Sequence, residues 1–188
     1  MEITIKPLSP DLLADYLHFF DHVAFTDHQD WSACYCIHFH WNSCWDHEPE
    51  RCNRDRVSEY ICKGKMHGYL AYTNDGNVVG WCNAGDTDSF AALGENTGIC
   101  PTGDKSLSVV CFLVAPDQRG NGIASALLER VCTDAAAAGY AYIEGYPLAG
   151  EADMYAAHHG TIALFAKYGF AAHAQNEGTC IVRKYLVN

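Results

Sequence analysis

Hydrophobic and polar residues follow two different periods along the chain, and these periods separate expected strands from expected helices. The alternating stretch EITIK (2–6) predicts a first strand. Helix-start residues Ser-Pro-Asp precede a helix expected over 11–22, and a weakly amphipathic run predicts a second helix over 51–67. Residues 68–85 contain two β-rich runs around Asn-Asp-Gly-Asn, whose residues tolerate the positive φ angles of a hairpin turn.

The second half of the chain begins with a nearly continuous apolar run over 106–116, SLSVVCFLVAP, which is typical of a central strand buried on both faces. Glycines bound an amphipathic helix expected over 122–139, and further strands are expected over 140–147 and 179–187. Between these strands, TIALFAKYGF (161–170) predicts a short helix with a glycine stop. The order of elements, β-α-α-β-β-β-α-β-α-β-β, indicates a mixed α/β fold.

Composition and charge narrow the class of protein. A chain of 188 residues, 49% hydrophobic and 19% charged, is expected to fold as one domain (1–188) with an ample core. Twenty-three acidic against 12 basic residues, a net charge of -11, argue against nucleic acid or an anionic membrane as partner. We see no signal peptide and no apolar run near the roughly 20 residues that span a bilayer. A cytoplasmic location is expected, with the ten cysteines as thiols or metal ligands.

The turn that follows the apolar strand, QRGNGIAS, is the strongest candidate for a binding site. A buried strand runs through Pro116 into QRGNGIAS and then into a helix, so free backbone N–H groups and the helix dipole meet at a glycine-rich turn. Such a turn suits an anion, above all a phosphate. The sequence contains no GxxxxGK[ST] phosphate-binding motif. It also fails to match the dinucleotide-binding fingerprint, because GNGIAS lacks the third glycine of that pattern.

This turn resembles the pyrophosphate loop of the GNAT superfamily of N-acetyltransferases, whose pattern Arg/Gln-x-x-Gly-x-Gly/Ala is filled by Arg119, Gly122 and Ala124. The combination of CFLVAP, IEGYP and GTIALFAKYGF resembles one bacterial branch of that superfamily, and the likeness covers nearly the whole chain. The resemblance implies a twisted mixed sheet of about seven strands with four helices and splayed central parallel strands. It also implies transfer of an acetyl group from acetyl-CoA to an amine.

The same resemblance implies roles for particular residues. The main chain of Phe112, Leu113 and Val114 would bind the pantetheine arm and polarise the acetyl carbonyl. The pyrophosphate loop, 118–124, would hold the phosphates through the amides of Arg119, Gly120, Asn121, Gly122, Ile123 and Ala124.

Acid and base residues are less clearly marked. Phe165 occupies the position where many family members carry a tyrosine that protonates the leaving thiol, and a phenyl ring has no proton to give. Tyr155, with His158 and His159, lies just before this helix and is an alternative donor. Glu144 interrupts an apolar strand expected to line the cleft, so it is the candidate base, or it pairs with an Arg or Lys.

The stretch SACYCIHFHWNSCWDH (32–47) mixes cysteines, histidines and aromatic residues within a segment, about 26–50, that the resemblance places beside the acceptor pocket. If extended, it would align Cys34, Cys36, His38 and His40 on one face. This spacing is not a recognised zinc signature, and Cys44, His47 or Cys52 would have to complete a tetrahedron, so no metal is expected. Acceptor-binding walls from Trp31, Tyr35 and Trp41 are the favoured interpretation.

The acceptor itself cannot be identified, but aromatic walls and acidic charge favour a small cationic or aromatic amine. Two alternatives stay open. The first is a non-catalytic acyl-CoA-binding sensor on the same fold, suggested by Phe165. The second is a zinc-binding module built on residues 34–52. A homodimer is compatible with the sequence, whereas a thiol oxidoreductase is disfavoured because the chain contains no CxxC pair.

Overall fold

A seven-stranded sheet with the strand order β1-β2-β3-β4-β5-β7-β6 forms the centre of the molecule. The computed structural model describes residues 2–40, 49–93, 105–148, 156–176 and 178–186. The mixed α/β fold expected from the sequence is confirmed. None of the helices in these ranges is long and apolar enough to cross a membrane.

The elements follow the predicted order. The strands are β1 (Ile3–Pro7), β2 (Gly68–Thr73), β3 (Val78–Asp86), β4 (Ser106–Val114), β5 (Tyr142–Gly145), β6 (Ala171–Asn176) and β7 (Thr179–Tyr185). The α-helices are α1 (Leu13–His22), α2 (Pro49–Cys62), α4 (Ile123–Ala137) and α5 (Ile162–Lys167). Short 3-10 helices are η1 (Pro10–Leu12), η2 (Gln29–Cys34), η3 (His38–His40), η4 (Thr87–Ser89), η5 (Pro116–Gln118) and η6 (Ala156–His159).

The second helix ends earlier than its amphipathic pattern predicts, at Cys62 instead of residue 67. Gly64 adopts a φ of 64°, a left-handed conformation that stops a helix. Its N–H bonds to the carbonyl of Ile61, and the Lys65 N–H bonds to that of Tyr60. The glycine therefore sets the end of α2.

Strands β4 and β5 are parallel neighbours that pair over only part of their length. Their register runs from Ser106 opposite Tyr142 to Val109 opposite Gly145. Beyond that point β4 continues to Val114 beside β3, whereas β5 ends at Gly145. The two strands therefore diverge at the centre of the sheet, as the family resemblance implied.

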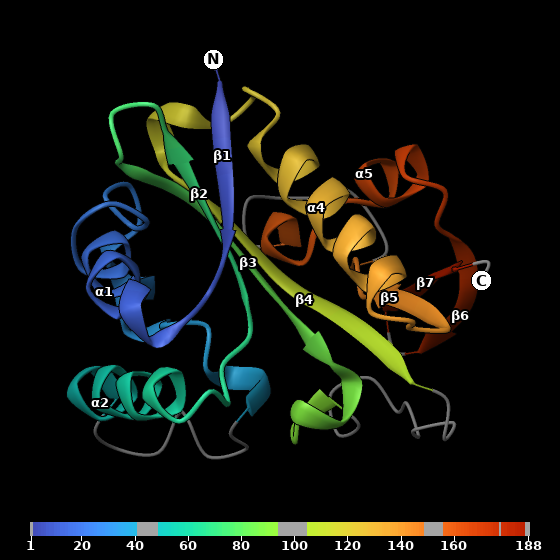
Figure 1. Ribbon diagram of the computed structural model, residues 1–188, viewed down its shortest axis with the longest axis horizontal. Coiled ribbons are helices and arrows are strands. Elements are labelled where there is room, and N and C mark those ends of the chain that lie inside the picture. Colours follow the sequence, from blue (N-terminus) through green and yellow to red (C-terminus); the bar gives the residue numbers. More distant parts are fainter. Residues whose placement is uncertain (1, 41–48, 94–104, 149–155, 177, 187–188) are drawn as a thin grey trace.

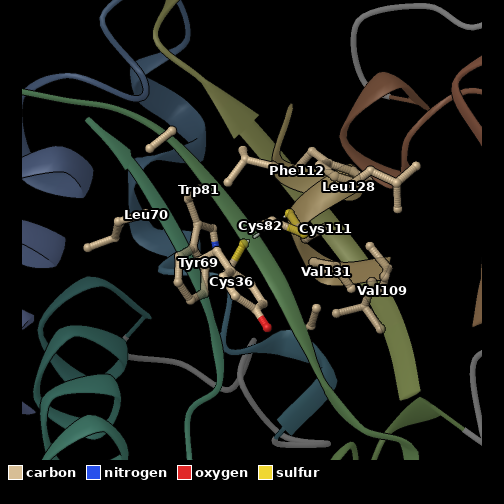
Figure 2. Close-up of a cluster of buried hydrophobic side chains, with 14 of the residues drawn as sticks. Cys36, Tyr69, Leu70, Trp81, Cys82, Val109, Cys111, Phe112, Leu128 and Val131 are labelled. Atoms are coloured by element: carbon tan, nitrogen blue, oxygen red, sulfur yellow. Dashed lines mark hydrogen bonds between the residues drawn. The ribbon is translucent and has the colours of Figure 1, made fainter. Parts of the chain in front are cut away.

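Helices cover both faces of the sheet, with α1 and α2 on one face and α4 and α5 on the other (Figure 1). Successive residues of β3 point to opposite faces of the sheet, so the strand contacts the helices on both faces. Trp81 packs edge-on against Tyr16 of α1 with ring centroids 5.0 Å apart, while a Cβ at Gly80 would lie 2.7 Å from Ile123 of α4. Figure 2 shows the resulting buried cluster around β3 and β4.

Candidate functional site

A cavity of about 1140 Å³ lies where β4 and β5 diverge, and it reaches the start of α4 at one end and residues 24–39 at the other. Of the nine residues predicted to bind the cofactor, all except Asn121 line it: Phe112, Leu113, Val114, Arg119, Gly120, Gly122, Ile123 and Ala124. The structure thus gathers the strand end and the glycine loop of the sequence analysis around a single space.

The glycine loop opens onto this space because two of its residues have left-handed backbones. Gly120 has a φ of 80° and Gly122, the N-cap of α4, a φ of 81°. A Cβ placed on either glycine would meet nothing within 4 Å. The first turn of α4 carries no acidic residue. Exposed main chain, a helix N-terminus and the lack of nearby helix carboxylates together suit a bound anion.

Arg119 of this loop forms an ion pair with Asp27, which belongs to the acceptor-side segment and also lines the cavity. The hydrogen bond from the Arg119 guanidinium holds the pKa of the Asp27 carboxyl below its usual value. The pair joins two segments 92 residues apart in the sequence. The two ends of the cavity are therefore connected by a charge contact.

The stretch over residues 29–40 is not the extended strand considered above. It forms η2 and η3, and between them Tyr35 and Cys36 have φ angles of 42° and 49°. Trp31 lines the cavity and stacks on His28 with centroids 4.4 Å apart. Tyr35 does not line it, because its ring stacks on Phe20 in the core. The expectation for Tyr35 is corrected accordingly, and Trp41 lies outside the described residues.

The row of cysteines and histidines is divided by these turns. Cys34, Cys36 and His38 line the cavity, but His40 is buried apart from it, with its Nε2 3.4 Å from the amide oxygen of Asn83. Among the described residues, no three His, Cys, Asp or Glu side chains form a group that could hold a metal ion. Cys44 and His47 lie outside the described part of the chain.

Phe165, at the position expected for a tyrosine, is fully buried and does not line the cavity. Its ring atom Cζ lies 2.3 Å from where a Cβ on Gly145 would be, so the ring rests directly on the glycine of β5. In this chain the position belongs to the core, where it packs against Phe112 and Phe170.

A buried polar chain runs from the cavity wall to the far side of β5. Tyr146 lines the cavity, and its hydroxyl lies 2.6 Å from Ser108 Oγ and donates to Glu144 Oε2 at 3.2 Å. Glu144 is 2% exposed, and its Oε1 accepts hydrogen bonds of 2.9 and 2.7 Å from Arg183. Burial, and then the charge of Glu144, raise the pKa of Tyr146. Glu144 reaches the cavity only through Tyr146.

Tyr146 is a candidate functional residue that the sequence analysis missed. Residues two apart in a strand share a face, so Glu144 already indicated the direction of Tyr146. The sequence did not show that Tyr146 bonds both Glu144 and Ser108, because Ser108 lies 38 positions earlier in β4.

His159, at the end of η6, also lines the cavity, and its ring lies 5.9 Å from that of Phe39. Burial lowers its pKa to about 4, so the imidazole is neutral at pH 7. Its Nδ1 is buried without a hydrogen-bond partner, while the main chain of Val110 bonds the ring. The Val110 bond therefore involves Nε2 and leaves Nδ1 as an acceptor. Tyr155 lies outside the described residues.

Comparison with known proteins agrees with this geometry. The model of the acetyltransferase (GNAT) family matches residues 28–170. No curated protein sequence matches the chain significantly. The chain belongs to the GNAT acetyltransferase family.

Solved structures show the same fold at low sequence identity. A GNAT-family acetyltransferase from Listeria monocytogenes superposes with a TM-score of 0.63 at 14% identity, covering 99% of this chain and 96% of that one. PaiA N-acetyltransferase from Thermoplasma acidophilum, in complex with coenzyme A, gives 0.60 at 12% identity, with 98% and 99% covered. The mosquito protein arylalkylamine N-acetyltransferase-like 5b gives a TM-score of 0.61 at 13% identity, with 98% of this chain and 100% of that one covered.

Proposed function

We propose that this protein is a cytoplasmic N-acetyltransferase that moves the acetyl group of acetyl-CoA directly to the nitrogen of a small-molecule amine. The observation that carries the proposal is the cavity, which joins an anion-binding helix start to an apolar, aromatic wall across the divergence of β4 and β5. The coenzyme A complex of the Thermoplasma neighbour supports the cofactor. The arylalkylamine N-acetyltransferase-like protein among the neighbours is consistent with the acceptor class.

The cofactor residues act chiefly through their main chain. The amides from Arg119 to Ala124, Asn121 included, hold the pyrophosphate at the start of α4. The main chain of Phe112 to Val114, left without a β5 partner, binds the pantetheine arm and polarises the acetyl carbonyl. Asp30 lines the cavity and favours approach of a cationic amine, whereas the charge of Asp27 is neutralised by Arg119, and Trp31 supplies apolar surface.

Proton transfer is assigned to Tyr146. The neutral amine attacks the carbonyl carbon, the carbon–sulfur bond breaks, and Tyr146 gives its proton to the departing thiolate. Glu144, proposed from the sequence as the base, acts here as a positioning residue that orients the Tyr146 hydroxyl. Nδ1 of His159 is an acceptor for the proton that the amine loses. The role predicted for Tyr155 stays a prediction.

The first test is thermal melting against a titration of acetyl-CoA. Saturation at about a hundred times the dissociation constant stabilises by roughly 2.7 kcal/mol, or about 5–10 °C at this size. Gly122→Ala is expected to abolish most of that shift. Gly139→Ala is the matched control, because Gly139 lies at the other end of α4 with a similar φ of 73° and equally open surroundings. No shift for the wild type at millimolar acetyl-CoA would refute the proposed cofactor.

The second test is turnover. A screen of small amines should yield free CoA, and Tyr146→Phe should lower kcat about 10²-fold or more while leaving the acetyl-CoA-induced melting shift unchanged. If Tyr146 donates the proton, Tyr146→Phe should also remove the fall of kcat at alkaline pH that deprotonation of the tyrosine causes. A merely structural role would not produce this change in the pH profile. Tight acetyl-CoA binding without turnover on any amine would instead favour the acyl-CoA sensor.

A further inference from the structure

Two thiols from distant parts of the chain meet on the cavity wall. Sγ of Cys36 lies 2.9 Å from Sγ of Cys111 in β4, and the residues are 75 positions apart in the sequence. Both residues line the cavity, and both belong to the buried cluster of Figure 2. A disulfide bond is about 2.05 Å long, so the sulfurs are less than about 1 Å from bonding distance.

The backbone that brings Cys36 to this position is held in an unfavourable conformation. Tyr35 and Cys36 are the non-glycine residues with positive φ in the described part of the chain, and they are consecutive. Left-handed backbone is disfavoured for residues with a Cβ, so the surrounding structure must impose it. The Tyr16 hydroxyl donates to the Tyr35 carbonyl at 2.6 Å, and the Asn83 amide donates to the Cys36 carbonyl at 2.9 Å.

These two hydrogen bonds come from different elements, α1 and β3, and both donors are buried. Their combined effect is to fix the turn that directs the Cys36 thiol at Cys111. A third thiol, Cys34, hydrogen bonds with Cys36 and also lines the cavity. Strained backbone in folded proteins clusters at functional sites. The strain at Tyr35 and Cys36 brings two sulfurs together at a cavity, which indicates that the pair has a chemical function.

We propose that Cys36 and Cys111 are a reversible thiol-modification site that forms a disulfide on reaction with the disulfide of a low-molecular-weight thiol. In the first step one protein thiol attacks the small disulfide, forming a mixed disulfide and releasing one small thiol. The second protein thiol then attacks the mixed disulfide, and the Cys36–Cys111 bond forms as the second small thiol leaves. The two cysteines lose two electrons and two protons, and the oxidant gains them.

Access and rate follow from the surroundings of the two thiols. Burial raises the pKa of Cys36, and its hydrogen bond to Cys111 adds to this. For Cys111 the hydrogen bond from Cys36 lowers the pKa, but burial and the neighbouring thiols bring it above the ordinary value. Because thiolate is the reacting form, the pair reacts more slowly than exposed Cys62. The oxidant reaches both sulfurs through the cavity, and their bond changes the surface that a ligand meets there.

The test uses the full chain and hydroxyethyl disulfide as the oxidant. After incubation, remaining thiols are alkylated under denaturing conditions and the peptides are mapped by mass spectrometry. Cys62 is the internal control, since its mixed disulfide shows that the oxidant has acted. The expected result is a cross-linked peptide pair containing Cys36 and Cys111, which dithiothreitol reverses. Incubation continues well beyond complete modification of Cys62, because the buried pair is expected to react more slowly. Recovery of Cys36 and Cys111 as alkylated thiols at that point would overturn the proposal, and so would a disulfide that includes Cys34.

Variants give an independent readout by melting. Closing a loop of this length with a disulfide should raise the melting temperature of the oxidised protein by about 5–15 °C. Cys82→Ser is the matched control, because Cys82 is buried in the same cluster but does not line the cavity, and it should keep the rise. Cys36→Ser should lose the rise and leave Cys111 as a mixed disulfide. A rise that persists in Cys36→Ser contradicts the assignment. The peptide map of the wild type decides the question even if this variant folds poorly.

Discussion

Replacing Arg183 by methionine should destabilise the protein severely, because it leaves a carboxylate buried without its cation. Glu144 and Arg183 face each other across β5 and β7, with 2% and 11% of their side chains exposed. Arg183 makes two hydrogen bonds to Glu144 Oε1, and its guanidinium lies 4.0 Å from the centre of the Tyr142 ring. Methionine keeps an unbranched apolar side chain of similar reach, so the substitution removes the guanidinium with its two hydrogen bonds and its contact with the Tyr142 ring.

The size of the effect follows from this burial. Removing one partner of a buried ion pair costs about 3–5 kcal/mol, whereas exposed pairs contribute at most about 1 kcal/mol. After the substitution, Glu144 keeps its hydrogen bond of 3.2 Å from Tyr146. At this chain length the loss corresponds to a melting temperature lower by about 6–20 °C. The double variant Glu144→Gln with Arg183→Met removes both charges and should recover at least half of the lost stability.

Urea unfolding followed by far-ultraviolet circular dichroism measures these free energies, and the four proteins of the cycle yield the coupling between the two charges. Lys63→Met serves as the control, because the pair that Lys63 forms with Glu59 is more than half exposed and should leave the midpoint nearly unchanged. An Arg183→Met variant that loses less than about 1 kcal/mol, or a double variant no more stable than it, would show that the reasoning from burial is wrong.

Three further predictions concern other parts of the molecule. Asp27→Asn should remove a negative charge beside the glycine loop and tighten acetyl-CoA binding about two- to fivefold at low salt, measured by calorimetry; weaker binding would contradict it. Burial lowers the pKa of His40 to about 4, below its unfolded value of 6.5. The contribution of neutral His40 to the free energy of unfolding is therefore complete above pH 6.5 and is lost as pH falls towards 4. At pH 5 that loss is about 2 kcal/mol in urea unfolding, and His40→Gln should show a correspondingly smaller difference between pH 7 and 5. Gly145→Ala should cost about 1–3 kcal/mol through its clash with Phe165, and adding Phe165→Leu should restore part of it; an alanine variant of wild-type stability would place the ring elsewhere.

The fold was predictable because its signals are local. A buried apolar run, glycine stops and the turn at QRGNGIA each depend on neighbouring residues, and each lies where the sequence indicated. The predicted end of α2 was wrong because Gly64, two residues after Cys62, stops the helix although the amphipathic pattern continues beyond it. The end of the cavity at the glycine loop was predictable for the same reason, since one strand and the following loop supply it.

The other end of the cavity could not be predicted in this way, because its geometry depends on contacts between distant residues. Whether Glu144 is a base or an ion-pair partner is decided by its register with Arg183, 39 positions later. Whether Tyr35 faces the cavity or the core is decided by left-handed backbone that Tyr16 and Asn83 impose from other elements. No local pattern in the stretch around Tyr35 carries that information.

The same contacts imply an order of events during folding. Three main-chain carbonyls of the acceptor-side segment accept hydrogen bonds from side chains of α1, α2 and β3: Tyr16 to Tyr35, Asn53 to Ala33, and Asn83 to Cys36. Those donors are 19, 20 and 47 residues away, so the segment has no template until the helices and the central strand are assembled. We therefore expect this part of the cavity wall to become ordered only after those elements have assembled, and its amides to exchange with solvent faster than those of the sheet in a native-state hydrogen-exchange experiment.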